Sequence, residues 1–243
     1  MTLIRFLRRF LLLLAHTGRG IRVSLRQLRA PLPDPEPVSA WSRRLLEILG
    51  VELECHGQPP TGSALIVANH LSWLDIPVIA ACSRAAFLSK ESIRRWPLIG
   101  WFARAAGTLF IRRGKGEAKQ VSRAIAQRLA LGRQMALFPE GRIGDNHEVQ
   151  RFFPPLFAAA IDAHVPVVPV ALRYGGPREA EDAVLYRPGR SFLGILFRLL
   201  ARPRTRASLF FCPPISPEGR DRRALARAAR QAILEALSGG EEG

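Results

Sequence analysis

The strongest indication of the fold is the stretch Ala64-Leu65-Ile66-Val67-Ala68-Asn69-His70-Leu71-Ser72-Trp73-Leu74-Asp75. Its first five residues are apolar and predict a buried strand, because a short unbroken apolar run is typical of strands covered on both faces. Pro77 indicates that a helix begins close by, since proline is favoured in the first helical turn. A buried strand that leads directly into a helix is the repeating unit of α/β domains.

The same alternation of apolar runs and helical spacing continues along the 243-residue chain. Further strands are predicted at 51–55, 85–88, 108–111, 135–138 and 165–172. Helices are predicted at 41–49, 74–82, 92–105, 117–131 and 155–163, and a last helix follows Ser216. We therefore predict a single α/β domain with a largely parallel central sheet flanked by helices on both faces.

His70 and Asp75 are candidates for acid–base chemistry. They lie five positions apart, which is about 140° of rotation on a regular helix, so they would not share a helical face. They can meet if His70 lies in the turn and Asp75 in the first turn of the helix. The pair then forms a general base, because the carboxylate keeps one ring nitrogen protonated. Alternatively, Ser72 and Asp75 form a variant of the capping box and His70 only packs.

Three later segments favour the catalytic interpretation. They are Gly107-Thr108-Leu109-Phe110-Ile111-Arg112-Arg113, Phe138-Pro139-Glu140-Gly141-Arg142 and Val165-Pro166-Val167-Val168-Pro169-Val170. Together with Asn69-His70-x4-Asp75, and in this order, they resemble the four sequence blocks of the glycerolipid acyltransferases. The most similar branch is that of the 1-acylglycerol-3-phosphate (lysophosphatidic acid) acyltransferases, and the resemblance covers about residues 40–215.

This resemblance implies an O-acyltransferase that moves a fatty acyl group from an acyl thioester to the free hydroxyl of a lysophospholipid. His70 is then the base for that hydroxyl, and Asp75 orients the imidazole. The chain has no Gly-x-Ser-x-Gly motif, so we expect direct transfer without an acyl-enzyme. No cofactor or metal is expected. The acyl thioester is a co-substrate, carried by coenzyme A or by acyl carrier protein, and the sequence does not indicate which.

The other blocks contain the predicted substrate-binding residues. By resemblance, Arg113 binds the acceptor phosphate, for which the planar guanidinium is well suited. Glu140 and Gly141 help to bind the glycerol-phosphate part, and their block presents a backbone N–H to the oxyanion. The remaining candidates are Arg142, Asn69 and Lys90. Without the resemblance, Arg113 would be a solvated arginine and the segment 139–141 a surface turn.

Two departures from the family pattern concern the acceptor. The family commonly has Asp or Asn before the arginine of the second block, where this chain has Arg112. It commonly continues the third block with Thr-Arg or Thr-Thr, where this chain has Arg142-Ile143. The base is intact, so the chemistry is expected to be retained. Another acceptor, such as a lyso-ornithine lipid, stays open.

Residues 1–30 form a separate basic segment, with seven arginines and no acidic residue. Its longest unbroken apolar run, 10–15, has six residues, whereas a bilayer span needs about 20. We predict an amphipathic helical arm in the headgroup layer, with its arginines reaching lipid phosphates. A signal peptide and an ordinary packed helix are the alternatives. A proline-rich linker at 31–40 is predicted to lead to the acyltransferase domain at 41–243.

The net charge of +16 favours an anionic partner, and we predict a membrane phospholipid surface on the cytoplasmic face of the inner (plasma) membrane. The three cysteines are scattered in apolar stretches, which predicts reduced core thiols. Their spacing does not suggest a zinc site. A nucleic-acid-binding module is the alternative from another class, but the phenylalanines are not interleaved with the basic residues. A catalytically silent lipid-surface protein is a further alternative, and the apolar segment 191–200 is either a second membrane contact or a buried helix.

Overall fold

The computed structural model describes residues 2–30, 33–112, 117–144, 149–175, 184–185 and 189–239. In these residues the strands form one seven-stranded sheet in the order β1-β7-β6-β2-β5-β3-β4. The strands are β1 (Val51–His56), β2 (Ala64–Ala68), β3 (Ala85–Lys90), β4 (Leu109–Ile111), β5 (Gln134–Leu137), β6 (Val167–Tyr174) and β7 (Thr205–Phe211). Neighbouring strands are parallel except β6 and β7, which confirms the prediction of a largely parallel sheet.

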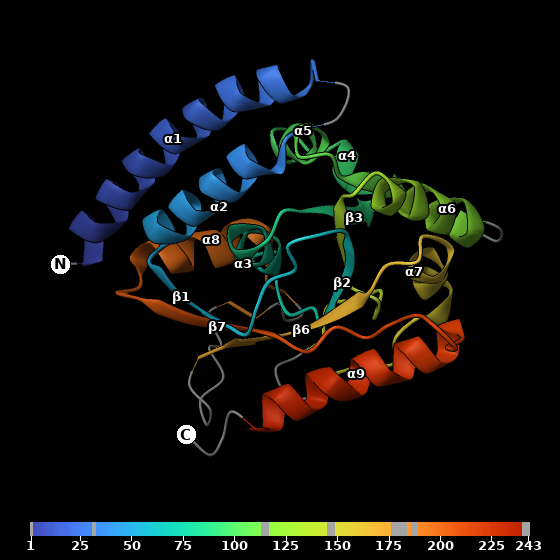
Figure 1. The fold of residues 1–243 in the computed structure, drawn as a ribbon. Helices are drawn as coiled ribbons and strands as arrows, with labels where there is room; N and C mark the ends of the chain where they lie inside the picture. Colours follow the sequence, from blue (N-terminus) through green and yellow to red (C-terminus); the bar gives the residue numbers. More distant parts are fainter. Residues whose placement is uncertain are drawn as a thin grey trace.

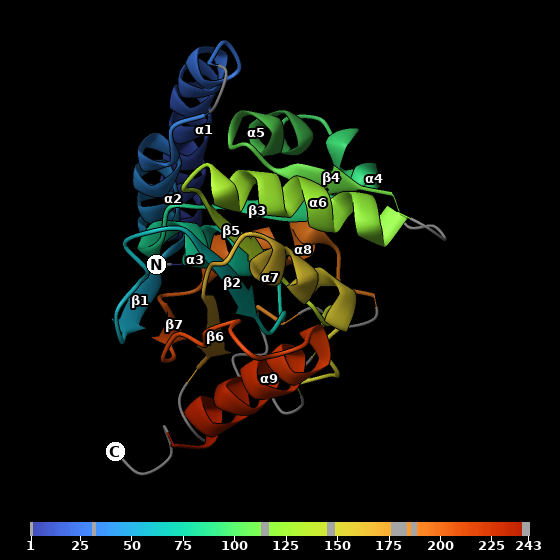
Figure 2. The ribbon, with the colours of Figure 1, turned by 45° about the vertical axis from the view of Figure 1, so that its right-hand side comes forward.

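Helices cover both faces of the sheet. They are α1 (Thr2–Gln27), α2 (Pro35–Leu49), α3 (Asp75–Cys82), α4 (Glu91–Arg94), α5 (Ile99–Ala105), α6 (Glu117–Ala130), α7 (Ala158–Asp162), α8 (Phe192–Ala201) and α9 (Arg222–Gly239), with a 3-10 turn at Pro154–Phe157. Figures 1 and 2 show α1 and α2 on one side of the sheet and α9 on the other.

The central strand β2 shows why both faces are covered. Ala64, Ile66 and Ala68 point into a core shared with α2, α3 and α8. The alternating residues Leu65 and Val67 point into a second core, shared with α6, α7 and α9. Side chains alternate between the two faces of a strand, so an unbroken apolar run is stable only between two helical layers.

Two predicted boundaries were wrong because of proline. Helix α2 begins at Pro35, inside the predicted 31–40 linker, because Asp34 caps it by accepting a hydrogen bond from the Glu36 N–H at 3.0 Å. Proline fits the first turn of a helix, where its missing N–H costs nothing. The predicted helix 92–105 is instead the pair α4 and α5, separated around Pro97, and Leu98 has φ of 60°.

Helix α1 packs on the domain with an arginine at the junction. The Arg9 guanidinium is buried and donates to the carbonyls of Leu199 and Pro203, at 3.1 and 2.9 Å, at the C-terminal end of α8. It also lies against Gly50, the left-handed C-cap of α2, where a Cβ would collide with it. A cation is favoured there, because the last carbonyls of a helix have no partners within the helix. Arg9 therefore does not reach lipid phosphates as predicted.

The structure corrects the prediction of reduced cysteines in part. Cys55 of β1 and Cys82 of α3 form a disulfide, with Cα atoms 6.9 Å apart, whereas Cys212 is free and buried. The two half-cystines are 27 residues apart in the chain, and only the packing of α3 beside the β1 end of the sheet brings them together. Among the helices that the structure describes, none has the length and apolar character needed to cross a membrane.

Candidate active site

Several predicted site residues lie at one edge of the sheet. Strands β2, β3, β4 and β5 are mutually parallel, so their carboxyl ends meet at this edge. The predicted residues His70, Lys90 and Glu140 lie at or just beyond these ends. Ligands of open parallel sheets bind at this edge, because the loops that follow the strands converge there. The predicted phosphate ligand Arg113 lies outside the described residues.

His70 and Asp75 form the predicted pair. His70 lies in the turn after β2, Asp75 is the first residue of α3, and His70 Nδ1 is 2.8 Å from Asp75 Oδ2. The same carboxylate oxygen accepts the N–H groups of Leu71 and Ser72, at 2.6 and 2.9 Å. The contact with Ser72 resembles the carboxylate half of a capping box, but the Ser72 hydroxyl accepts the Leu74 N–H, at 3.4 Å, and not that of Asp75. The backbone contacts orient the carboxylate, and the catalytic role of the pair stays a prediction.

Tyr174 completes the surroundings of Asp75. The side chain of Asp75 is fully buried, and Tyr174, the last residue of β6, donates its hydroxyl to Asp75 Oδ1 at 2.9 Å. Burial, together with the negative charge of Asp75, raises the pKa of Tyr174 well above its ordinary value, so its hydroxyl stays a donor. Tyr174 was not predicted as a site residue, because a tyrosine at the end of a buried strand does not indicate contact with a carboxylate far away in the sequence.

The backbone and ring of His70 are also held. Its N–H donates to Glu140 Oε1 at 2.9 Å, and its carbonyl accepts the Gly144 N–H at 2.6 Å. The imidazole stacks on Phe138, with ring centroids 4.0 Å apart. With Nδ1 donating to Asp75, the other ring nitrogen, Nε2, is the one able to accept a proton. The His70 side chain is 18% exposed, so it is not sealed in the core.

Glu140 bonds to the protein backbone through both of its carboxylate oxygens. Its second oxygen accepts the Gln150 N–H at 2.9 Å, and its contact with the substrate stays a prediction. Burial raises the pKa of Glu140, and the N–H groups of Gln150 and His70 act in the opposite direction. Glu140 thus ties the His70 turn to the loop that follows β5.

Two further predicted contacts are engaged within the protein. The Asn69 side chain is 3% exposed and bonds to both the N–H and the carbonyl of Leu172, so it joins the end of β2 to β6. The Gly141 N–H closes a turn onto the Phe138 carbonyl at 3.1 Å, so this N–H is not free for an oxyanion. The structural contacts of Asn69 and Gly141 were not predicted, because only the folded backbone brings their partners close to them.

The remaining predicted residues lie at the rim. Lys90 ends β3 and is exposed. Arg142 is also exposed and donates to the Gln150 side chain at 2.5 Å. Their positions suit contact with an anionic acceptor. In the described ranges, the side chains of histidine, cysteine, aspartate and glutamate do not gather in a group of three that could hold a metal ion.

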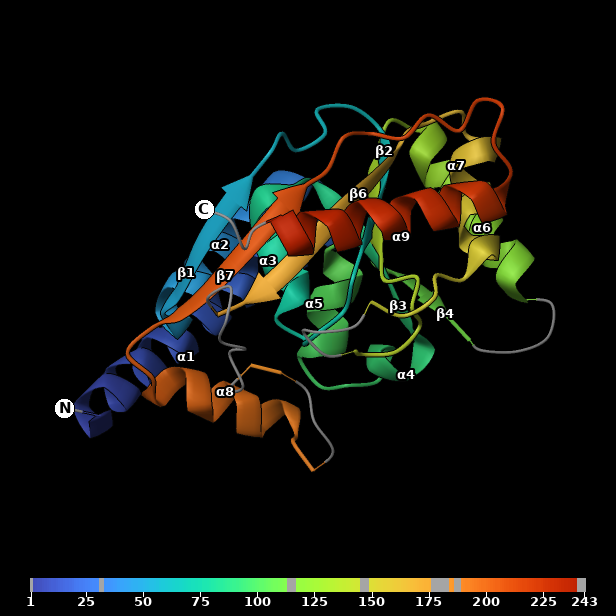
Figure 3. The same ribbon diagram turned by 90° about the horizontal axis from the view of Figure 1, so that it is seen from below.

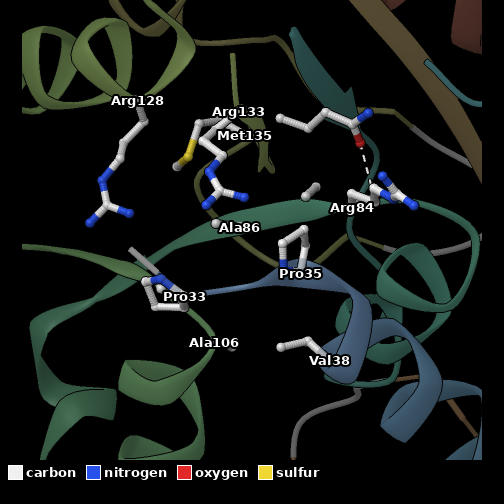
Figure 4. Close-up of a pocket in the computed structure, with 12 residues that line it drawn as sticks. Pro33, Pro35, Val38, Arg84, Ala86, Ala106, Arg128, Arg133 and Met135 are labelled. Carbon is white, nitrogen blue, oxygen red and sulfur yellow. Dashed lines mark hydrogen bonds between the residues drawn. The ribbon is translucent and has the colours of Figure 1, made fainter. Parts of the chain in front are cut away.

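A small arginine-lined pocket lies elsewhere. Figure 4 shows Arg128 and Arg133 above Pro33, with Ala86 and Met135 between them. Ala86 and Met135 are near the amino ends of β3 and β5, so this pocket lies at the sheet edge opposite His70. It is therefore not part of the candidate active site.

The chain is similar to known acyltransferases. Residues 52–173 match the family model described as Acyltransferase. A lyso-ornithine lipid O-acyltransferase of Pseudomonas aeruginosa is 38% identical over 227 residues, which is 91% of this chain and 88% of the relative. A 1-acyl-sn-glycerol-3-phosphate acyltransferase of Neisseria gonorrhoeae is 33% identical over 205 residues, covering 81% of this chain and 78% of the relative.

The fold has a counterpart among solved structures. The crystal structure of the 1-acyl-sn-glycerophosphate (LPA) acyltransferase PlsC from Thermotoga maritima superposes with a TM-score of 0.75 at 20% identity. The match covers 100% of this chain and 97% of that one. With the sequence matches and the His70–Asp75 geometry, it leads to one conclusion: the chain belongs to the acyltransferase family and is an O-acyltransferase.

Proposed function

We propose that this enzyme acylates the free hydroxyl of a lysophospholipid, with His70 as the general base and 1-acylglycerol-3-phosphate as the acceptor. The observation that carries the proposal is the 2.8 Å contact between His70 Nδ1 and the buried carboxylate of Asp75. With Nδ1 engaged by Asp75, Nε2 is the ring nitrogen that can take the hydroxyl proton.

The proposed reaction needs no enzyme nucleophile. The acceptor oxygen attacks the thioester carbonyl while its proton moves to His70 Nε2, and Asp75 stabilises the imidazolium. The tetrahedral intermediate then collapses, the C–S bond breaks, and the imidazolium returns the proton to the departing thiolate. Cys82, the cysteine nearest in sequence to His70, is held in the disulfide and is not a competing nucleophile. The thioester of coenzyme A or of acyl carrier protein is the proposed donor.

A lyso-ornithine lipid is a second candidate acceptor. The relative with that name shares 38% identity with this chain, against 33% for the relative named for 1-acylglycerol 3-phosphate. Arg112 and Arg142 stand where the phosphate-acylating family commonly has other residues. Both candidates present a hydroxyl to His70, so they differ in headgroup recognition and not in chemistry.

Mass spectrometry of the products separates the two acceptors. The purified chain is given equal amounts of 1-acylglycerol 3-phosphate and a lyso-ornithine lipid, with acyl-coenzyme A or acylated carrier protein as donor. The proposal expects phosphatidic acid, and a His70→Ala sample serves as the control. If only the lyso-ornithine lipid is acylated, the proposed acceptor is wrong and the role of His70 is unaffected. If neither acceptor gives a product, the proposed function is contradicted.

The membrane surface is the proposed site of action. Helix α1 carries apolar residues on more than one side. Phe6, Phe10 and Leu13 pack against the domain core, and the polar residues Arg9, His16, Ser24 and Gln27 are also buried there. Its exposed side carries the apolar stripe of α1, formed by Leu3, Ile4, Leu7, Leu11 and Leu14. Apolar side chains aimed outward gain stability only when they contact another apolar phase, and a lipid surface provides it.

The cytoplasmic face of the inner membrane remains the proposed location. The proposed acyl donors, thioesters of coenzyme A or of acyl carrier protein, are cytosolic and support this location. The cysteines no longer support it, because disulfides are rare in a reducing compartment and Cys55 and Cys82 form one here.

A further inference from the structure

Helix α8 is only half covered by the protein. Ile195, Leu199 and Leu200 are buried in the core beneath it, as the sequence periodicity requires. On its outer side, Leu193 is 56% exposed and Phe197 46% exposed. A ten-residue helix of this apolar character belongs either inside a protein or against an apolar phase. Its outer side is therefore an interaction surface without a partner in the described chain.

This surface is continuous with the apolar stripe of α1. Figure 3 shows α1 and α8 side by side along one side of the molecule. The rings of Phe6 and Phe197 lie 6.0 Å apart across the junction, and Arg5 donates to the Ala201 carbonyl at 2.9 Å. The two helices are thus packed against each other, and Phe197, on the outer side of α8, lies next to α1.

The N-terminal end of α8 lies beside the catalytic turn. Phe192 packs on Trp73, which stands between His70 and Asp75 in the chain, with ring centroids 4.6 Å apart. On its other side Phe192 meets Trp96, at 6.4 Å, and Trp96 is itself exposed. One aromatic ring therefore separates the outer surface of α8 from the loop that holds the base.

The charged side chains of α1 and α8 are all basic. Exposed arginines adjoin its apolar residues in sequence: Arg8 follows Leu7, Arg95 precedes Trp96 and Arg198 follows Phe197. Neither α1 nor α8 contains an acidic residue. Apolar residues edged by arginines match the two layers of an anionic lipid surface, with acyl chains inside and phosphates above them.

We propose that α8 is a second membrane contact, which joins α1 to form a two-helix docking surface for an anionic phospholipid bilayer. The contact fixes the orientation of the enzyme, so that the His70 turn lies at the bilayer and a lyso-lipid reaches the base without leaving it. This inference rests on the proposed function in one respect, which is that the acceptor is a lipid of the membrane.

Vesicle binding tests the docking surface directly. The full chain is mixed with vesicles of phosphatidylglycerol and phosphatidylethanolamine, and bound protein is measured by co-sedimentation for Leu193→Glu and Phe197→Glu. Each is expected to weaken binding about tenfold, since a carboxylate replaces apolar contact area and is repelled by the anionic headgroups. The matched control is Leu131→Glu, at a residue 66% exposed in the turn after α6, which should bind as the wild type does.

The readouts separate this proposal from the proposed function. Leu193→Ser and Phe197→Ser are milder variants for the case that a glutamate prevents folding, and thermal unfolding identifies such a case. Wild-type binding by both α8 variants, or an equal loss in Leu131→Glu, overturns the docking proposal whatever the enzyme acylates. Binding requires no acyl transfer, so an inactive wild type that still depends on Leu193 and Phe197 contradicts only the proposed function.

Discussion

The carboxylate of Asp75 is surrounded by donors from three directions. His70 Nδ1, two backbone N–H groups and the Tyr174 hydroxyl all reach it, and it is fully buried. A buried charge without partners costs several kcal/mol, so these donors are needed for an ionised Asp75. Tyr174 does not touch the substrate position; it acts on the base through Asp75.

Replacing Tyr174 by Phe tests this positioning role. We expect kcat to fall about tenfold with little change in KM, because the carboxylate is less well oriented. The acid limb of the kcat/KM profile should move to higher pH, since a carboxylate with one donor fewer holds the imidazolium more strongly. Loss of the hydrogen bond should lower the free energy of unfolding by about 1–3 kcal/mol.

A double-mutant cycle provides the control for Tyr174. In an Asp75→Asn background, Tyr174→Phe should have little further effect on kcat, because the two residues act through one contact. An unchanged pH profile in the single variant would leave Tyr174 a purely structural residue.

At the scale of elements, α1 depends on a buried histidine. His16 stacks on Trp41 of α2, with ring centroids 4.7 Å apart, and its Nε2 lies 3.0 Å from the Trp41 carbonyl. Burial lowers the pKa of His16, while the Trp41 carbonyl acts in the opposite direction. The packed environment therefore favours the neutral form of His16, and charging the ring opposes the docking of α1.

The docking of α1 should weaken as the pH falls. A histidine whose pKa is lower in the docked than in the undocked state contributes stability above its ordinary pKa of about 6.5, and this stability is lost as the pH falls through that value. The measured quantity is the protection of the α1 amides from hydrogen exchange, relative to the intrinsic exchange rate at each pH. This protection should be lower at about pH 5.5 than at about pH 7.5. His16→Gln should remove the dependence; equal protection of the wild type at both pH values is the contradicting outcome.

At the scale of the whole molecule, regular patterns were predictable and long-range contacts were not. The apolar run of β2 predicted a strand covered on both faces, and the spacing from His70 to Asp75 predicted a contact across a turn. Both predictions depend only on residues that are close together in the sequence. Strand β7 was missed as a strand, and with it the antiparallel β6–β7 pair, because pairing partners are set by the sheet.

The missed features share this physical origin. Tyr174 is 99 residues from Asp75, and Cys55 is 27 residues from Cys82. The residue types alone do not indicate that either pair is in contact. Arg9 was assigned to lipid phosphates because an arginine in a basic helix is usually exposed. Its burial depends on the unpaired carbonyls of α8, about 190 residues away along the chain.

The central claim is that His70 is the base, and turnover by His70→Ala tests it most directly. The variant is measured with the acceptor and donor that the wild type uses, at saturating concentrations, after thermal unfolding has shown that it is folded. We predict a fall in kcat of about 1,000-fold, since a positioned general base contributes on this scale. A folded His70→Ala protein that keeps more than about a tenth of wild-type turnover, far above the loss expected for a base, would contradict the account.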